Sequence, residues 1–413
     1  MYIHRSIESV LQRGIAEFPV IALMGPRQVG KSTLLLNVLN GKFNYISFDD
    51  MALRAQAKRD PVLFLKNNPP PLIIDEVQYV PEILPAIKIA VDKASRKGLF
   101  ILTGSQQFNL IRGLRESLAG RVLLLNLPPM TIAEKNGLGS KRPWIIRLFE
   151  DKKNIIPDVN VHDSDNRPTE RLFRGGLPGV GSISEDFVPS YFSSYIATYL
   201  ERDLPSQFEI KDPSQLLKFL QLLAPLSSCE INKSQLGREL GISPPTADRW
   251  VGWLSASLVW HEHQSFQNNS IKRVSRHPKG FLFDTGLICS LLQIPSASAI
   301  ETHPFTGSIF ETSARIELSA IISNHLVPAR IYHWRTPYSH EVDIVIDYNN
   351  RLFAFECKWH SDASPDDCRN LIRFRDEYGK AVAFLGVITP AGNFHEITEG
   401  IYQIPIDIAG ACS

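Results

Sequence analysis

Residues 25–32 read GPRQVGKS and fit the pattern G-x-x-x-x-G-K-[ST], between an apolar run and an amphipathic stretch. The two glycines let the backbone wrap around an anion with its N–H groups pointing inward. The N-terminus of the following helix adds partial positive charge, Lys31 can reach the β- and γ-phosphates, and the Ser32 hydroxyl can hold Mg²⁺. The pattern therefore predicts binding of ATP with Mg²⁺. The predicted contacts in this stretch are Gly25, Pro26, Arg27, Gln28, Val29, Gly30, Lys31, Ser32 and Thr33.

Two acidic residues end the later apolar run LIIDEVQ. Asp75 is predicted to hold Mg²⁺ through water, and Glu76 to polarise the water that attacks the γ-phosphate. An acid pair that caps the end of a strand is the alternative. In the next apolar run, LTGSQQ places Ser105 where a polar group can sense the γ-phosphate, although a solvated serine fits the sequence equally well.

Phosphoryl transfer also needs an arginine charge, supplied by the same subunit or by a neighbour. The candidates are Arg112, Arg115 and Arg121, which lie between the fourth and fifth apolar runs. A solvated arginine is the alternative for each of them, and the sequence does not choose among the three.

A second group of charged residues lies near the C-terminus. The run RLFAFECKWH places Glu356 and Lys358 two apart, so in a strand they share one face while Cys357 points away and offers its carbonyl. Asp343 lies on the preceding predicted strand and Glu311 on a predicted helix. Two carboxylates and a carbonyl suit Mg²⁺ or Mn²⁺, and Lys358 can position or deprotonate a metal-bound water.

This constellation resembles the PD-(D/E)XK nuclease fold. We predict Asp343, Glu356 and Lys358 as catalytic residues, with Glu311, Asp343 and Glu356 as metal ligands. The alternative is an inherited fold in which these side chains are solvated charges or form an ion pair at a strand edge.

Composition describes an ordinary globular protein. The chain has 413 residues, of which 44% are apolar and 21% charged, and its net charge is +1. This length predicts two or three domains, and the near-neutral charge means that any nucleic-acid binding must come from a local patch. Five scattered cysteines without a C-x-x-C pair indicate a reducing compartment. No run approaches the roughly 20 apolar residues of a membrane helix, so we expect a cytoplasmic protein without a membrane partner.

Short apolar runs alternate with helical patterns in the first third of the chain. Predicted strands cover residues 20–24, 44–48, 71–75, 99–104 and 121–127. Such alternation predicts a parallel sheet covered by helices on both faces. Residues 150–170 are polar and are predicted to form a loop. Beyond residue 305 we expect a long helix, strands at 330–334, 341–347 and 351–359, and a charged helix at 365–378.

A helix-turn-helix spacing occurs in residues 231–260. We expect the first helix to begin at Ser234, a turn at Gly241, and a second helix capped by Ser243 that ends near Trp260. The second helix offers only Arg249 as a basic group, which is poor for reading DNA bases. A following hairpin is predicted to carry the basic residues Lys272, Arg273, Arg276, His277 and Lys279. They can grip phosphates without reading sequence, or merely solvate the hairpin edge.

The triplet Asp284-Thr285-Gly286 also occurs in aspartic proteases, which need two such loops facing each other. This sequence has one, followed at once by a helical pattern. We therefore predict that Asp284 is a helix cap.

The stretches VIALMGPRQVGKSTLL, LIIDEVQ, FILTGSQQ and SLAGRVLLLNLPPMTIAE resemble the AAA-type ATPases of bacteria and archaea that carry a C-terminal domain of unknown function. LFRGGLPG, SSYIATYLERDL, FLFDTGL and GSIFET extend the resemblance over nearly the whole chain. It implies an ASCE-type sheet with the Glu76 strand inserted beside the phosphate-loop strand, and assembly into homo-oligomers. It implies no known substrate.

The predicted fold class is α/β: a P-loop sheet of the ASCE/AAA type, a helical and winged-helix part, and a PD-(D/E)XK nuclease-like α/β domain. The predicted domains are an ATPase domain (1–135), a helical connector (136–212), a winged-helix module (213–280) and a nuclease-like domain (281–413). The first functional hypothesis is a DNA-associated ATPase with a Mg²⁺-dependent nuclease-like domain. The alternatives are an ATP-dependent switch or scaffold whose degenerate C-terminal domain binds a protein, and a regulator that binds a specific DNA site.

Overall fold

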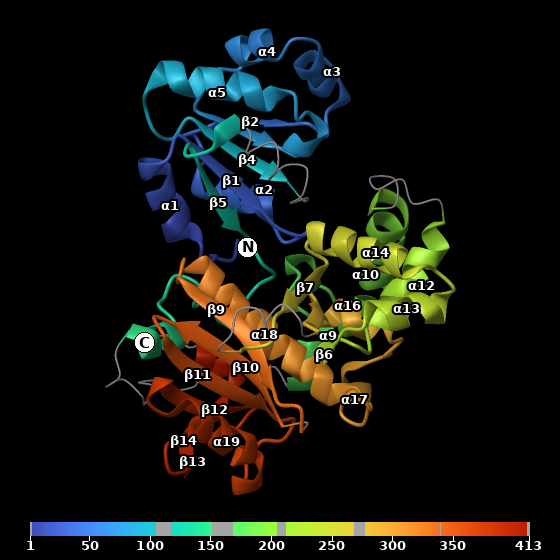
Figure 1. Ribbon diagram of the computed structural model, residues 1–413. Coiled ribbons are helices and arrows are strands. Elements are labelled where there is room, and N and C mark those ends of the chain that lie inside the picture. The colour runs from blue at the N-terminus through green and yellow to red at the C-terminus, as the bar shows by residue number, and fades with distance from the viewer. Residues whose placement is uncertain are drawn as a thin grey trace.

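The computed structural model describes residues 2–104, 117–150, 168–204, 212–267, 277–338 and 340–410, without the side chains of residues 201–203, 409 and 410 (Figure 1). Of the predicted site residues, Ser105, Arg112 and Arg115 lie outside the described residues. So do Lys272, Arg273 and Arg276 of the predicted basic hairpin, and nearly all of the predicted loop at 150–170.

The N-terminal sheet is wholly parallel, as the sequence predicts. Its strands are β1 (Val20–Met24), β2 (Asn44–Ser47), β3 (Leu72–Asp75), β4 (Phe100–Gly104) and β5 (Val122–Asn126), in the order β2-β3-β4-β1-β5. The expectation that the Glu76 strand lies beside the phosphate-loop strand is wrong. β4 pairs with both β1 and β3 and separates them.

Helices cover both faces of this sheet. α1 (Glu8–Glu17) and α2 (Lys31–Val38) pack with Ile21 and Leu23 of β1. The neighbouring Val20 and Ala22 face the other way and pack with α5 (Ile83–Ala94). Successive residues of a strand point to opposite faces, so a strand that is apolar throughout needs this double cover.

Two short helices on the second face were not predicted. They are α3 (Met51–Arg59) and α4 (Pro61–Asn67). The carboxylates of Asp50 and Asp60 cap their first turns by accepting backbone N–H bonds. A 3₁₀ turn, η1 (Val77–Tyr79), follows β3.

The middle of the chain is largely helical. Its elements are α7 (Ile132–Lys135), α8 (Trp144–Glu150), α9 (Pro168–Arg174), the 3₁₀ turns η2 (Pro178–Val180) and η3 (Glu185–Phe187), α10 (Val188–Tyr195), and the π-helix η4 (Ile196–Asp203). We refer to α10 and η4 together as the connector helix.

A small module follows with α12 (Pro213–Leu223), β6 (Cys229–Glu230), α13 (Lys233–Leu240), α14 (Pro244–Ala256), β7 (Trp260–His263) and β8 (Lys279–Leu282). Its sheet order is β6-β8-β7. Gly241 turns with φ 67° and Ser243 caps α14, as predicted. α14 ends at Ala256, because Trp260 belongs to β7. The winged-helix assignment itself stays a prediction.

β8 also crosses the predicted domain boundary at residues 280/281. The next elements are α16 (Thr285–Leu291) and α17 (Ala297–Ile300). Asp284 caps α16 by accepting the N–H of Leu287 at 3.1 Å, as predicted.

The C-terminal part contains a mixed sheet in the order β13-β14-β12-β11-β10-β9. Its elements are α18 (Thr306–Asn324), β9 (Ala329–Arg335), β10 (Glu341–Tyr348), β11 (Arg351–Cys357), the 3₁₀ turn η5 (Pro365–Cys368), α19 (Arg369–Tyr378), the 3₁₀ turn η6 (Gly379–Ala381), β12 (Val382–Thr389), β13 (His395–Thr398), β14 (Ile401–Pro405) and α20 (Ile406–Gly410). Phe353 and Phe355 pack on the α18 side, whereas Leu352 and Ala354 pack on the α19 side.

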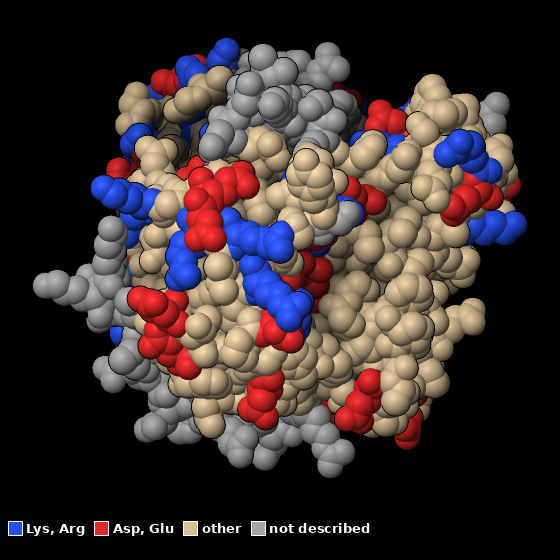
Figure 2. Space-filling model, turned by 60° about the horizontal axis from the view of Figure 1, so that its bottom comes forward, with Lys and Arg blue, Asp and Glu red and all other residues tan. Residues whose placement is uncertain are grey.

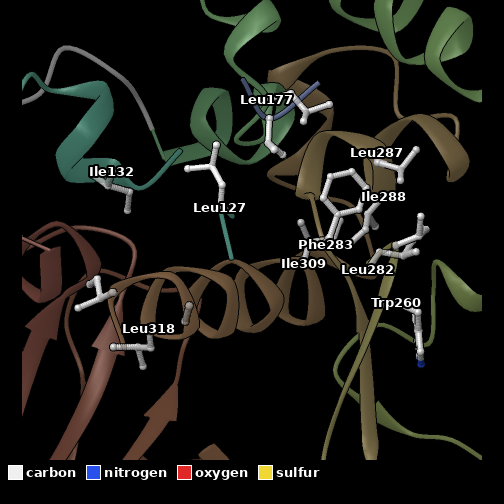
Figure 3. Packing of buried hydrophobic residues seen from close by; sticks show 14 of the residues in the cluster. Leu127, Ile132, Leu177, Trp260, Leu282, Phe283, Leu287, Ile288, Ile309 and Leu318 are labelled. Carbon is white, nitrogen blue, oxygen red and sulfur yellow. The ribbon is translucent and has the colours of Figure 1, made fainter. Parts of the chain in front are cut away.

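One apolar core joins these parts. Leu127 and Ile132, next to the N-terminal sheet, belong to the same buried cluster as Leu177 of the middle segment and Ile309 and Leu318 of α18 (Figure 3). The predicted domains therefore share this cluster, while a second buried cluster lies within the N-terminal sheet region and a third lies around α19. Among the described residues, no helix is both long and apolar enough to cross a membrane.

Buried charges lie at the same junction. Glu317 of α18 is 5% exposed and accepts the N–H of Ile132 at 3.0 Å. Burial raises the pKa of Glu317 from its ordinary value of 4.5 to about 7, and the nearby Glu134 adds to the rise. Lys135 donates to the carbonyl of Gly175, and burial lowers its pKa.

We expect Glu317→Gln to make folding less sensitive to pH. A carboxyl whose folded pKa is raised holds its proton in the folded state, so wild-type stability falls as pH rises from 4.5 through 7. Glutamine keeps the acceptor and has no charge to bury, so the variant gains up to about 3 kcal/mol over wild type across that range. Urea unfolding at several pH values measures this difference in the free energy of unfolding. The exposed Glu377→Gln is the control, and a constant difference between Glu317→Gln and wild type would contradict the prediction.

Candidate functional site

The phosphate-binding loop joins β1 to α2, and its glycines are sterically required. A Cβ on Gly25 would lie 2.4 Å from the carbonyl oxygen of Leu127, so no larger residue fits. Gly30 precedes the first residue of α2 with φ 92°, and Gln28 adopts φ 64°. The loop therefore curls at the carboxyl edge of the sheet, with the free N–H groups of the first turn of α2 beside it.

Lys31 lies inside this loop and is 6% exposed. Its ammonium donates to the carbonyl oxygens of Gly25 and Pro26, both at 2.9 Å. Burial lowers the Lys31 pKa, and the charges of Glu76 and Asp75 oppose that effect. A buried ammonium held only by carbonyls is well suited to an anionic ligand, so the loop fits a triphosphate.

Asp75 collects hydroxyl groups from three elements. Its Oδ2 accepts from Ser32 Oγ at 2.6 Å and from the Tyr45 hydroxyl at 2.5 Å, while the Thr103 hydroxyl donates to Oδ1. Ser32 and Asp75, the predicted magnesium pair, thus lie next to each other, and their oxygens are the kind that Mg²⁺ prefers. Tyr45 and Thr103 were not foreseen. Thr103 has a signal in the sequence, since it is a polar residue near the carboxyl end of a buried strand.

Glu76 directly follows β3 with φ 55°. Its N–H donates to the Thr103 hydroxyl at 3.2 Å, and the Gln78 amide donates to its carboxylate. Burial raises the Glu76 pKa, while the Lys31 charge acts in the opposite direction. The carboxylate therefore lies close enough to Lys31 to interact with it, and its role in polarising water stays a prediction.

Arg121 occupies the opposite edge of the sheet. It directly precedes β5, which runs parallel to β1, whereas the loop follows β1. Its Nε pairs with Asp92 Oδ1 at 2.6 Å. An arginine at the amino edge cannot reach the phosphates bound at the carboxyl edge of its own sheet, so a catalytic role for Arg121 requires a neighbouring subunit.

The connector helix contacts the phosphate-binding loop. The Tyr191 hydroxyl donates to Gln28 Oε1 at 2.6 Å. The Arg27 guanidinium lies 4.9 Å from the centre of the Tyr199 ring, and it also donates to the Tyr79 hydroxyl at 3.4 Å. Sequence reasoning missed the contacts with Tyr191 and Tyr199 because they join residues more than 160 positions apart.

The C-terminal candidates come together on adjacent strands. β10 and β11 pair antiparallel with Ile344 opposite Phe355, which places Asp343 opposite Glu356. Lys358 Nζ lies 3.0 Å from Glu356 Oε1. The Cys357 N–H donates to Asp343 Oδ2 at 2.8 Å, a contact that was not predicted.

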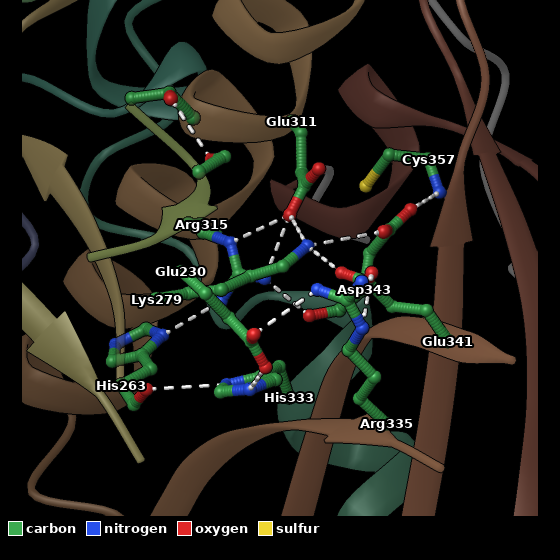
Figure 4. A network of polar contacts seen from close by, with 12 residues as sticks. Glu230, His263, Lys279, Glu311, Arg315, His333, Arg335, Glu341, Asp343 and Cys357 are labelled. Atoms are coloured by element: carbon green, nitrogen blue, oxygen red, sulfur yellow. Dashed lines mark hydrogen bonds and ion pairs between the residues drawn. The ribbon is translucent and has the colours of Figure 1, made fainter. Parts of the chain in front are cut away.

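Lys279 enters this cluster from β8 (Figure 4). Its Nζ lies 2.8 Å from Glu311 Oε1 and 3.5 Å from Asp343 Oδ1, and it also pairs with Glu341. Its side chain is 4% exposed. The expectation that Lys279 serves an exposed, phosphate-gripping hairpin is wrong, because the residue points inward; His277 is exposed.

Arg315 supports the cluster from α18, one helical turn after Glu311. Its guanidinium donates twice to Glu311 Oε1, at 3.0 and 2.7 Å, and it also donates to the main-chain oxygen of Asp343. The i,i+4 spacing of Glu311 and Arg315, and the shared strand face of Glu341 and Asp343, were the available sequence signals.

The carboxylates of this cluster differ in the direction of their pKa shifts. Burial opposes ionisation of Glu311, but Lys279 and Arg315 outweigh it and lower its pKa. Burial raises the pKa of Asp343 to about 6, with Glu311 adding to the rise. Burial and the charge of Asp343 raise the pKa of Glu356. Among the described residues, no three His, Cys, Asp or Glu side chains are arranged to hold a metal ion. The roles of Glu311, Asp343, Glu356 and Lys358 stay predictions.

The small middle module offers little to DNA in the part that the structure describes. Arg249 lies over the Trp253 ring at 6.0 Å, and Asp248 pairs with Lys233 at 2.9 Å. On the face shown in Figure 2, positive and negative side chains lie intermixed on one half, and the other half is mostly uncharged. No extended basic surface appears on that face.

Comparison with known families agrees with this geometry. Residues 17–136 match a family described as AAA domain, and they contain the loop, Asp75 and Glu76. These residues form an AAA-type ATPase-like domain. Residues 166–298 match a domain of unknown function, DUF8612, and residues 306–409 match another, DUF4143. ATP binding is expected of such a domain, typically with Mg²⁺.

Two curated relatives align over nearly the whole chain. The uncharacterized protein Rv2008c of Mycobacterium tuberculosis is 28% identical over 406 residues, which is 98% of this chain and 83% of the relative. The uncharacterized protein Mb2031c of Mycobacterium bovis matches with the same values.

Solved structures with similarity to this chain include P-loop ATPases. The Walker-type ATPase PABY2304 of Pyrococcus abyssi is 15% identical, with a TM-score of 0.47, over 71% of this chain and 96% of its own. AMPPCP-bound DnaA of Aquifex aeolicus is 13% identical, with a TM-score of 0.30, over 60% of this chain and 85% of its own.

We expect Lys31→Met to abolish binding of Mg·ATP. The substitution keeps the length of the side chain and removes the charge that the triphosphate would meet inside the loop. Isothermal titration should show at least about a hundredfold loss of affinity, close to 3 kcal/mol. Lys42→Met, at an exposed site beyond α2, is the control and should bind like wild type. Unchanged binding by Lys31→Met would refute the assignment of the loop.

Proposed function

We propose that this protein is an ATP-hydrolysing switch in which the nucleotide state of the phosphate-binding loop controls how its C-terminal half engages a protein partner. The observation that carries the proposal is the Tyr191–Gln28 hydrogen bond of 2.6 Å, supported by the Arg27–Tyr199 contact. Both contacts join the loop to the connector helix.

Nucleotide binding would change the phosphate-binding loop at the residues that contact the connector helix. Lys31 is held by two loop carbonyls, and a triphosphate would draw it away and reorganise the backbone around Gln28. ATP can shift the connector helix only if the protein binds ATP more tightly with the helix in one position than in another. The hydrogen bond between Gln28 of the loop and Tyr191 of the helix is a contact that can make ATP affinity depend on the helix position.

The connector helix leads on toward the C-terminal half. A Cβ on Gly286 of α16 would lie 2.4 Å from the Phe192 ring, and the rings of Tyr195 and Phe283 lie 6.3 Å apart. Because these side chains are closely packed, a displacement of α10 would also displace α16 and the end of β8. Those elements adjoin α18 and the charged cluster.

Hydrolysis needs an arginine near the phosphates, and Arg121 faces the opposite edge of its own sheet. The proposal therefore includes a homo-oligomer in which a neighbour supplies that charge. It also includes a cytoplasmic location: the four cysteines within the described residues, Cys229, Cys289, Cys357 and Cys368, are unpaired.

Hydrogen exchange tests the switch. Adding Mg²⁺ with a non-hydrolysable ATP analogue should change hydrogen exchange of the connector helix, residues 188–203, in wild type and not in Lys31→Met. Tyr191→Phe should keep nucleotide affinity within about threefold, because the hydroxyl touches a side chain and not the phosphates. It should, however, lose most of the exchange response.

The control is Tyr338→Phe, since the Tyr338 side chain is 83% exposed and is distant in sequence from the phosphate-binding loop and the connector helix. It should respond like wild type. An undiminished response in Tyr191→Phe would exclude signalling through this contact.

A second candidate function is a DNA-processing enzyme whose C-terminal site cuts phosphodiesters with Mg²⁺ or Mn²⁺. Its support is the placement of Asp343 opposite Glu356, with Lys358 3.0 Å from Glu356. The charge pairing of Lys279 with Glu311 and Asp343 favours the switch instead.

A cleavage assay separates the two functions. Wild type, Lys31→Met and Asp343→Asn are incubated with single-stranded, duplex and branched DNA, with Mg²⁺ or Mn²⁺, with and without ATP. The switch predicts ATP hydrolysis without cleavage, equal in wild type and Asp343→Asn. Cleavage by wild type that Asp343→Asn loses would establish the second candidate.

A further inference from the structure

The Lys279 ammonium lies where a cation among the C-terminal carboxylates would lie. It reaches Glu311 at 2.8 Å and Asp343 at 3.5 Å, and it pairs with Glu341 (Figure 4). These carboxylates come from one helix and one strand, whereas the lysine comes from β8 of the small middle module. One ammonium group from the small module thus pairs with three carboxylates of the C-terminal part.

A second observation concerns a buried carboxylate on the adjacent strand. Glu356 is 5% exposed, and its Oε2 is buried with no hydrogen-bond partner. Only its Oε1 is bound, by Lys358 at 3.0 Å. Glu356 stands opposite Asp343 on the adjacent strand, so the two side chains share one face of the sheet. An unpartnered, buried carboxylate oxygen is costly unless a cation or a proton serves it.

The arrangement of charges explains why the cluster is stable as it stands. The carboxylates of Glu311, Glu341, Asp343 and Glu356 face the cations Lys279, Arg315 and Lys358. Without the Lys279 ammonium, three of the carboxylates would lose a common counter-ion in a buried place. Leaving buried charges of one sign together is strongly unfavourable, so another cation would be drawn in.

We propose that the Lys279 ammonium is a built-in counter-ion that fills a divalent-cation position beside Glu311, Asp343 and Glu356. Ammonium and divalent cation exclude each other there. Among the described residues, the carboxylates as they stand around Lys279 are not arranged to hold a metal ion. The wild-type protein therefore holds no Mg²⁺ or Mn²⁺ at this position, whereas a variant without the ammonium does.

This inference is independent of ATP binding and bears on the C-terminal half alone. It gives a physical reason why that half can engage a partner without cutting nucleic acid. Failure of the ATP switch would leave it untouched, because its test involves no nucleotide.

The test is Mn²⁺ binding by Lys279→Met, which keeps the length and apolar part of the side chain and removes its charge. Electron paramagnetic resonance of free Mn²⁺ measures binding, and thermal unfolding measures the stabilisation that binding brings. Lys279→Met should bind one Mn²⁺ per chain at least about tenfold more tightly than wild type. Millimolar Mn²⁺ should raise its midpoint by about 3 °C or more, with little change for wild type.

Two further variants locate the ion. Lys380→Met is the control: it removes an exposed lysine outside the cluster, leaves Lys279 in place, and should behave like wild type. Lys279→Met combined with Asp343→Asn should lose the gained site, because one of its predicted ligands is gone. Mn²⁺ that persists in this double variant would lie elsewhere and would overturn the proposal.

A charge-balanced double variant decides the question where Lys279→Met is too poorly folded to assay. Lys279→Met with Glu341→Gln removes one charge of each sign and keeps Glu311, Asp343 and Glu356. Binding of Mn²⁺ by this folded double variant, and not by wild type, supports the inference. Equal binding by wild type and either Lys279 variant, or no binding by any of them, overturns it.

Discussion

The ion pair between Arg5 and Glu134 holds the parts of this protein together. Its atoms lie 3.0 Å apart, and the two side chains are 4% and 0% exposed. Arg5 also donates to the carbonyl of Val29 in the phosphate-binding loop at 2.8 Å, and the Glu134 carboxylate accepts from the Ser6 N–H at 2.7 Å. Breaking a buried pair of this kind costs about 3–5 kcal/mol, because the remaining buried charge loses its counter-ion. The N-terminal segment, the loop and the start of α7 are thereby held in one arrangement.

The same constraint recurs wherever the segments meet. Lys135 uses the carbonyl of Gly175, and Lys279 uses the carboxylates of α18 and β10. In each case a cation carried by one segment is bound by oxygen atoms of another, so the segments cannot separate without leaving a buried charge unpaired. The apolar cluster that runs through all of them has the same consequence. The segments of the protein are therefore connected, and a movement of the phosphate-binding loop affects the segments packed against it.

Local chemistry explains which features could be predicted from the sequence. The loop glycines, the parallel strands, the Asp284 cap and the Glu356–Lys358 pair all depend on spacings of a few residues, and spacing is visible in a sequence. Tyr45 and Thr103 around Asp75, and Tyr191 beside Gln28, come from distant segments that only the fold brings together. α3 and α4 were missed because each depends on one capping aspartate and carries a weak apolar pattern.

Lys279 shows why a basic run can mislead. Its neighbours in sequence suggested an exposed, positively charged hairpin, yet alternation along β8 turns Lys279 inward, where Glu311 receives it. β8 spans the predicted boundary at residues 280/281: it completes the sheet of the small module and also carries the counter-ion of the C-terminal cluster. The family boundaries fall between residues 298 and 306, after α16. Since β8 serves both sides, the small module and the C-terminal sheet respond together to any displacement that reaches β8 through Phe283.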